Sequence, residues 1–137
     1  MNSFFSFGKN KKRDSQTLFN NWLTMIIQNE TPDSSIIAVN IGIFESDKGF
    51  QLYFAGFRDY DIDNDDWATG LGDFSPRDKY LLLDNSDFKG QNWEFAQNKV
   101  ADWTNNFLKI DLYKDSFLEK LIAITVGFDD GDLVKIK

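Results

Sequence analysis

The sequence predicts an α+β domain, in which a largely antiparallel sheet of about five strands carries two or three helices. Two stretches show apolar residues at helical spacing, and several others are extended apolar runs joined in hairpin pairs. The chain has 137 residues, of which 42% are hydrophobic and 27% are charged. This size and composition are typical of one globular domain.

Residues 1–13 are expected to be a flexible basic segment that precedes a single domain over residues 14–137. The segment contains three Phe and the cations Lys9, Lys11, Lys12 and Arg13. A membrane-surface anchor would use both features, because apolar insertion and attraction to anionic lipid add together. The alternative is a frayed terminus whose Phe side chains dock on the domain.

The first helix is expected to begin at Asp14 or Ser15, either of which can cap it. It should end near Thr31, because the residue before Pro32 avoids the helical conformation. Trp22 lies on its apolar face and is expected in the core.

A β-hairpin follows over residues 36–44 and 50–57, joined by a turn at 45–49. Its nearly continuous apolar character indicates strands covered on both faces or central in the sheet. Gly42 and Gly56 are expected to mark bulges or close backbone approach.

The second half of the chain is expected to supply two further strand regions and a helix. Residues 79–84 resemble a short buried strand, and 85–91 a polar turn. A helix is predicted over 92–108, with a further helical piece over 112–120 and a closing hairpin over 121–128 and 133–137.

The connection over residues 58–77 is longer than most loops in a compact domain and is strongly acidic. From Asp59 to Asp73 there are six Asp and no Lys or Arg. The loop contains five apolar anchors, four within this stretch and one just beyond it, namely Tyr60, Ile62, Trp67, Leu71 and Phe74. These anchors predict an ordered loop that packs on itself.

Asp61, Asp63 and Asp65 have the opening spacing of a calcium-binding loop. The sixth position of that register is Asp66 instead of Gly, and the twelfth is Gly72 instead of Glu. We therefore expect no metal site and no cofactor there. The acidic run at 129–132 is interpreted as a turn.

The formal charge of the chain is -7, and its four N-terminal cations leave -11 on the rest. Such a charge argues against nucleic acid as a partner and favours a basic protein, whose encounter it would steer. There is no His and no Cys, so the usual general base and thiol nucleophile are missing, and an enzyme is not expected. No apolar run reaches the roughly 20 residues of a membrane span. We expect a cytoplasmic protein.

The predicted partner-binding surface is the acidic loop with its aromatic residues. Its members are Asp59, Tyr60, Asp61, Asp63, Asp65, Asp66, Trp67 and Asp73. The carboxylates would steer and pair with cations, while the rings would anchor the partner. For Trp67, packing on its own domain and contact with a partner both remain open, and the aspartates have the alternative of a simple solvated face.

The succession Ile41-Gly-Ile-Phe-Glu45, Gly49-Phe-Gln-Leu-Tyr-Phe-Ala-Gly56, Tyr60 and Asp65-Asp-Trp67 resembles small acidic immunity proteins of bacterial polymorphic-toxin and contact-dependent inhibition systems. The resemblance implies a cytoplasmic antitoxin that neutralises a cognate toxin domain, often a basic nuclease, by covering or distorting its active site. The alternatives are a structural or regulatory interaction domain without a toxin partner and a metal-dependent enzyme that uses the Asp cluster.

Overall fold

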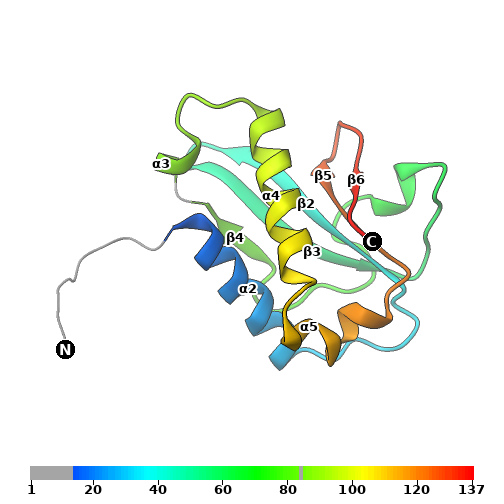
Figure 1. Ribbon diagram of the computed structural model, residues 1–137. Helices are drawn as coiled ribbons and strands as arrows, with labels where there is room; N and C mark the ends of the chain where they lie inside the picture. The colour runs from blue at the N-terminus through cyan, green and yellow to red at the C-terminus, as the bar shows by residue number, and fades with distance from the viewer. Residues whose placement is uncertain (1–13, 84) are drawn as a thin grey trace, which may run out of the picture.

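The computed structural model describes residues 14–83 and 85–137, which build one five-stranded sheet in the order β4-β3-β2-β5-β6 (Figure 1). The strands are β2 (Ala38–Ser46), β3 (Gly49–Phe57), β4 (Tyr80–Leu82), β5 (Ala123–Phe128) and β6 (Val134–Lys135). All neighbouring strands are antiparallel except β2 and β5, which are parallel. The fold is therefore α+β, as the sequence predicts, with a mixed but mostly antiparallel sheet.

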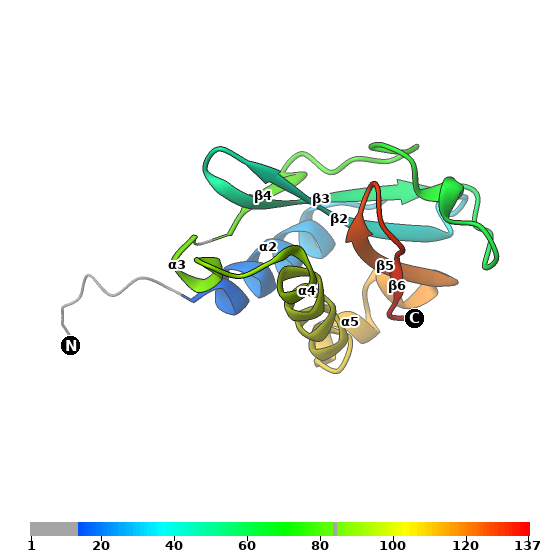
Figure 2. The same ribbon diagram turned by 90° about the horizontal axis from the view of Figure 1, so that it is seen from above.

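Two long helices, α2 (Ser15–Asn29) and α4 (Trp93–Phe107), lie on one face of the sheet (Figure 2). Helix α2 begins with one of the two predicted caps, since Asp14 accepts from the Thr17 amide at 2.8 Å. Helix α4 is capped by Asn92, which accepts from the Phe95 amide at 3.0 Å. The described residues also form four single helical turns, namely η1 (Asp65–Ala68), α3 (Asn85–Phe88), α5 (Asp111–Lys114) and η2 (Phe117–Lys120). None of the described helices is both long enough and apolar enough to cross a membrane.

The main core lies between this sheet face and the two long helices. Trp22 is buried there, as expected, and its indole nitrogen donates to the Asp78 carbonyl at 2.6 Å. Phe19 of α2 packs against Trp103 of α4 with ring centroids 5.7 Å apart. The two long helices therefore cover one face of the sheet, and loop residues pack on the other face.

The short strand predicted at 79–84 is present, but its expected burial was wrong for most of its residues. β4 is a three-residue edge strand in which Tyr80 is 49% exposed and Leu82 is 44% exposed. Their side chains point to the sheet face opposite α2 and α4, whereas Leu83, just past the strand, is buried in the main core. An apolar run at an edge therefore buries only part of its side chains.

Other expected boundaries shift by a few residues. The first strand begins at Ala38, the polar turn at 85–91 contains α3, and the piece at 112–120 is divided into α5 and η2. Both hairpins are confirmed, and the nearly continuous apolar character of β2 reflects its central place in the sheet. The predicted basic segment at 1–13 lies outside the described residues.

A smaller apolar cluster covers the opposite sheet face. It contains Tyr53, Ala55, Phe57 and Ala68, with Phe44, Trp67 and Leu133 packed against it. The expected close approach at Gly42 is confirmed, because a Cβ there would lie 1.9 Å from Cζ of Tyr53. The Tyr53 ring therefore lies across β2, and this cluster supports the acidic loop.

Candidate functional site

The acidic loop leaves β3 and returns to it, so its two ends are held together. Gly56 donates to the Phe74 carbonyl at 2.8 Å, and Asp73 and Phe74 donate back to the Gly56 carbonyl at 2.8 and 3.1 Å. Gly72 has φ +68°, and a Cβ there would lie 2.4 Å from that same carbonyl. The loop closes in this way because Gly72 lets the backbone approach β3.

Arg58 fastens the closed loop from its base. Its amide donates to the Asp73 carboxylate at 2.9 Å, and its guanidinium lies 3.7 Å from Asp73 and 3.5 Å from Asp33. Arg58 Nε also donates to the Ser35 hydroxyl at 2.8 Å. Asp73, a predicted partner-binding residue, is thus already paired with Arg58 of its own domain.

The two aromatic residues of the loop pack on their own domain. Trp67 is partly buried and makes edge-on contacts with Phe57 and Tyr60, at ring-centroid distances of 5.3 and 5.0 Å. Lys135 Nζ lies 6.0 Å from the centroid of the Tyr60 ring. The ordered, self-packed loop expected from the sequence is therefore confirmed, and Tyr60 and Trp67 hold its acidic tip against the sheet.

Short polar contacts shape that tip. The Asp61 carboxylate accepts from the Asp63 amide at 2.9 Å, and Asn64 caps η1 by accepting from the Asp66 amide at 2.8 Å. Asp65 accepts from the amide of Leu133 at 3.0 Å, which ties the loop to the β5–β6 hairpin. Segments nearly seventy residues apart in sequence are joined by this bond.

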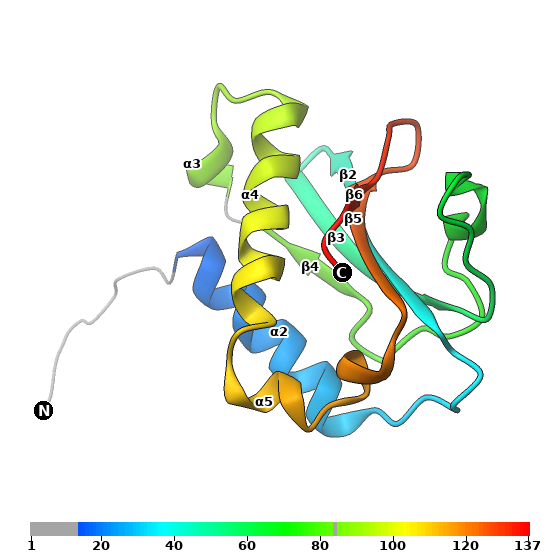
Figure 3. The same cartoon turned by 45° about the vertical axis from the view of Figure 1, so that its right-hand side comes forward.

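Between the loop and the turn that joins β5 to β6 lies a cleft of about 600 Å³. Figure 3 shows the backbone of the loop and of the β5–β6 hairpin beside each other. Its walls come from residues 62–66 and 68–70 on one side and 128–133 on the other. Six aspartates line it, namely Asp63, Asp65, Asp66, Asp129, Asp130 and Asp132. Every one of them is exposed, and no Lys or Arg is among the lining residues. We call this feature the acidic cleft.

The wall formed by the turn is braced through the sheet. The Tyr53 hydroxyl donates to the Asp129 carboxylate, and the Thr125 hydroxyl donates to Asn40 Oδ1 at 2.8 Å on the same sheet face. Burial of the Tyr53 side chain, reinforced by its bond to Asp129, raises the pKa of its hydroxyl well above the ordinary value. Tyr53 therefore remains a hydrogen-bond donor to the turn at neutral pH.

The cleft carboxylates are spread along its walls. Across residues 14–83 and 85–137, no group of three acidic side chains converges in a way that could hold a metal ion. Carboxylates arranged in this way attract extended cationic surfaces, since each can pair with a separate Lys or Arg.

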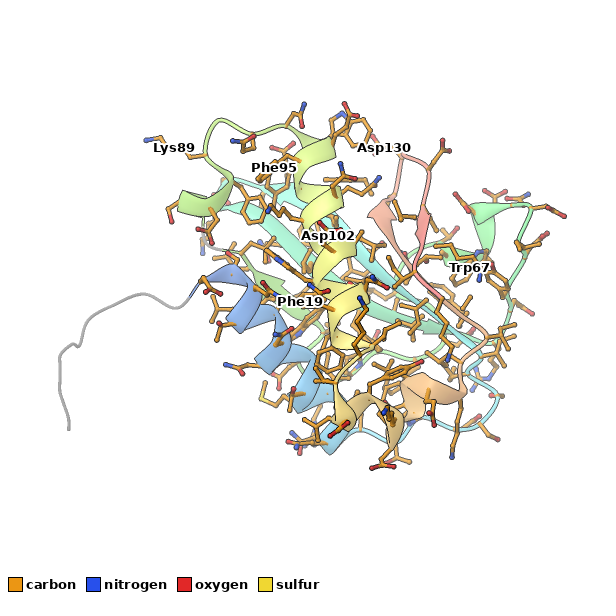
Figure 4. All side chains as sticks on the ribbon, in the orientation of Figure 1. Phe19, Trp67, Lys89, Phe95, Asp102 and Asp130 are labelled. Atoms are coloured by element: carbon orange, nitrogen blue, oxygen red, sulfur yellow. The ribbon has the colours of Figure 1, made fainter. Side chains whose placement is uncertain are left out.

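The structure divides the predicted surface. Asp63, Asp65 and Asp66 line the cleft, whereas Asp59 and Asp61 are exposed outside the set of lining residues. Tyr60, Trp67 and Asp73 make the contacts that order the loop. Figure 4 places Trp67 on the loop and Asp130 on the opposing turn.

Sequence reasoning missed the second wall of the cleft, because it assigned the acidic residues at 129–132 only to a turn. That turn interpretation is confirmed. The available signal was the run of aspartates itself, Asp129-Asp-Gly-Asp132. What brings it opposite the loop is the insertion of β5 beside β2 in parallel, which hairpin patterns do not reveal.

Fold and site together define an α+β domain in which the sheet face opposite α2 and α4 carries an acidic cleft. Comparisons of the chain with protein-family models, with curated proteins and with solved structures found no match.

Proposed function

We propose that the protein is a cytoplasmic protein-binding inhibitor of the immunity type, which neutralises a basic toxin domain through the acidic cleft. The observation that carries this proposal is the placement of six aspartates, from two distant segments, on the walls of one cleft. No reaction is assigned to the cleft, and its role is to bind.

Steering follows from the sign and position of these charges. A cleft lined by one sign of charge concentrates its field outward and accelerates association with an oppositely charged surface. The remaining chain adds to this field, since residues 14–137 carry 11 cations and 22 anions. Association should therefore be fast at low salt and should slow as salt screens the carboxylates.

The contacts that hold the cleft walls in place make binding of a partner more favourable. Arg58, Trp67 and the Asp65–Leu133 bond fix the loop, while Tyr53 fixes the turn. A preformed cleft loses little conformational entropy when a partner enters it. The loop aromatics act in this proposal as supports that hold the carboxylates in place.

The test begins with the gene adjacent to the one that encodes this chain. Its product, or that product's C-terminal domain, is expressed in bacteria with and without the present protein, and growth and complex formation are measured. We expect growth arrest without the protein and recovery with it. A neighbour that is harmless, or that arrests growth equally in both cases, would favour the alternative of an interaction domain without a toxin partner.

Charge-neutral variants then test the cleft. Replacing Asp63, Asp66 and Asp132 with Asn removes three cleft charges and should slow association about tenfold at low salt, with a flatter salt dependence. The matched control changes Asp102→Asn, Asp115→Asn and Glu119→Gln, three exposed carboxylates away from the cleft, with the same change in net charge. Equal slowing by the two triple variants would remove the cleft from the proposal.

A further inference from the structure

A second pocket lies on the other side of the turn that forms one wall of the acidic cleft. It has a volume of about 270 Å³ and is lined by Glu45, Trp93, Phe128, Asp130 and Gly131. Phe128, Asp130 and Gly131 also line the acidic cleft. The turn is therefore a ridge between the two hollows, and one bound surface can reach both.

Trp93 is the unusual member of this pocket, because 51% of its surface is exposed. It is the first residue of α4, next to the cap residue Asn92. Its ring stands edge-on to Phe128, with centroids 6.1 Å apart and planes at 85°. Phe128 packs in turn at 6.1 Å on Phe50, which is buried in the main core. Trp93 thus packs against Phe128 and still leaves about half of its surface open to solvent.

Two carboxylates accompany this ring. Glu45 is exposed near the end of β2, and Asp130 is exposed on the turn. A half-exposed indole beside carboxylates is an environment in which a planar cation binds well, because the ring quadrupole and the negative charges act together. A guanidinium suits it better than an ammonium, since it stacks on the ring and donates to carboxylates through a planar fork.

We propose that this second pocket, the Trp93 pocket, binds an arginine side chain of the basic partner and so provides a second anchor beside the acidic cleft. This inference rests on the proposed function for the nature of the partner. It adds the residue type that the partner presents and the place where it enters. A partner segment that crosses the turn sets cations in the cleft and one arginine against Trp93.

The direct test uses the whole protein and a small probe, N-acetyl-arginine methylamide. The chain has four Trp, and a Trp93→Phe variant assigns the Trp93 indole N–H resonance. At fixed ionic strength, the probe should shift this resonance saturably at millimolar concentrations. N-acetyl-lysine methylamide should bind about three- to fivefold more weakly, since the ammonium stacks less well.

Variants locate the probe. Glu45→Gln and Asp130→Asn should each weaken the arginine probe about two- to fivefold. Asp63→Asn, a change confined to the cleft, should leave the Trp93 titration unaltered. N-acetyl-leucine methylamide tests whether the pocket simply prefers an apolar side chain, and it should produce no saturable shift.

Three results would overturn the arginine anchor: an unmoved Trp93 resonance, equal affinity for lysine, or equal affinity for leucine. Its failure is separable from that of the proposed function. If the cleft triple variant slows association with the partner while the probe leaves Trp93 unmoved, only the arginine anchor falls. If the probe binds while the adjacent gene encodes no toxin, the anchor stands as a property of the site and the immunity role falls.

Discussion

Replacing Tyr53 with Phe tests the brace beneath the acidic turn. The Tyr53 side chain is 4% exposed, and its ring lies over Gly42. Its hydroxyl donates to the carboxylate of Asp129, beyond β5. Phe keeps the ring and its packing, so the substitution removes this hydrogen bond with little change in volume.

The expected loss follows from the surroundings of the two partners. A hydrogen bond to a charged group contributes about 1.5–3 kcal/mol to stability. Asp129 is exposed, so water replaces the lost donor, and Asn40 keeps its bond from Thr125. The change also takes the hydroxyl away from the buried Asn40 side chain, which is its second hydrogen-bond partner. We therefore expect a loss of about 1.5–3 kcal/mol in the free energy of unfolding.

The same substitution should change the pH dependence of stability at alkaline pH. The pKa of Tyr53 is raised in the folded protein above the value of 10.0 for an ordinary tyrosine, first by burial and then by the bond to Asp129. Stability from this group is fully present below pH 10.0 and is lost as pH rises toward the folded pKa. One such group contributes a slope of up to about 1.4 kcal/mol per pH unit.

Urea unfolding of both proteins between about pH 8 and about pH 11 measures this effect. The advantage of the natural protein over Tyr53→Phe should be constant below pH 10.0 and should shrink above it. Tyr80→Phe is the control, because Tyr80 is 49% exposed and its change should stay within about 0.5 kcal/mol. The reasoning is refuted if Tyr53→Phe and Tyr80→Phe lose equal stability, or if the difference between natural protein and Tyr53→Phe is the same at every pH.

Three further changes probe packing and are read by urea unfolding. Gly42→Ala should lower the free energy of unfolding by about 1–3 kcal/mol, because the added methyl group would meet the Tyr53 ring. Gly131→Ala is the control and should be neutral, since the nearest neighbour of its methyl group is 4.0 Å away. Equal losses in the two variants would contradict this reasoning. Gln97→Met should gain about 1 kcal/mol, because Gln97 Oε1 is buried without a hydrogen-bond partner among the described residues; a loss would contradict this. Trp67→Ala should lose about 1–3 kcal/mol with its two ring contacts and speed amide exchange at 58–74; unchanged exchange would contradict its supporting role.

The two long helices and the hairpins depend on residues close together in the chain, so the sequence predicts them well. Helix α2 follows from the spacing of its apolar residues, from Asp14 at its start and from Pro32 beyond its end. The hairpins follow from extended apolar runs around short polar turns. The sequence also predicts that the acidic loop is ordered, because the rings of Tyr60 and Trp67 can pack against the rest of the domain.

Exposure at the sheet edge is a different matter. Residues 79–84 are as apolar as a buried strand, yet two of the three residues of β4 are open to solvent. A strand loses solvent contact only where an element covers it, and covering depends on its place in the sheet. Composition alone therefore overestimated the burial of this strand.

Residues near one another in the chain are enough to predict the α+β class, the two long helices, the hairpins and the acidic character of the loop. The packing of distant segments adds three further relations: β5 lies beside β2, the aspartates after β5 face Asp63, Asp65 and Asp66, and Tyr53 crosses Gly42 to hold them. These relations join segments about seventy residues apart, and they depend on strand order and on the fit of side chains across the sheet.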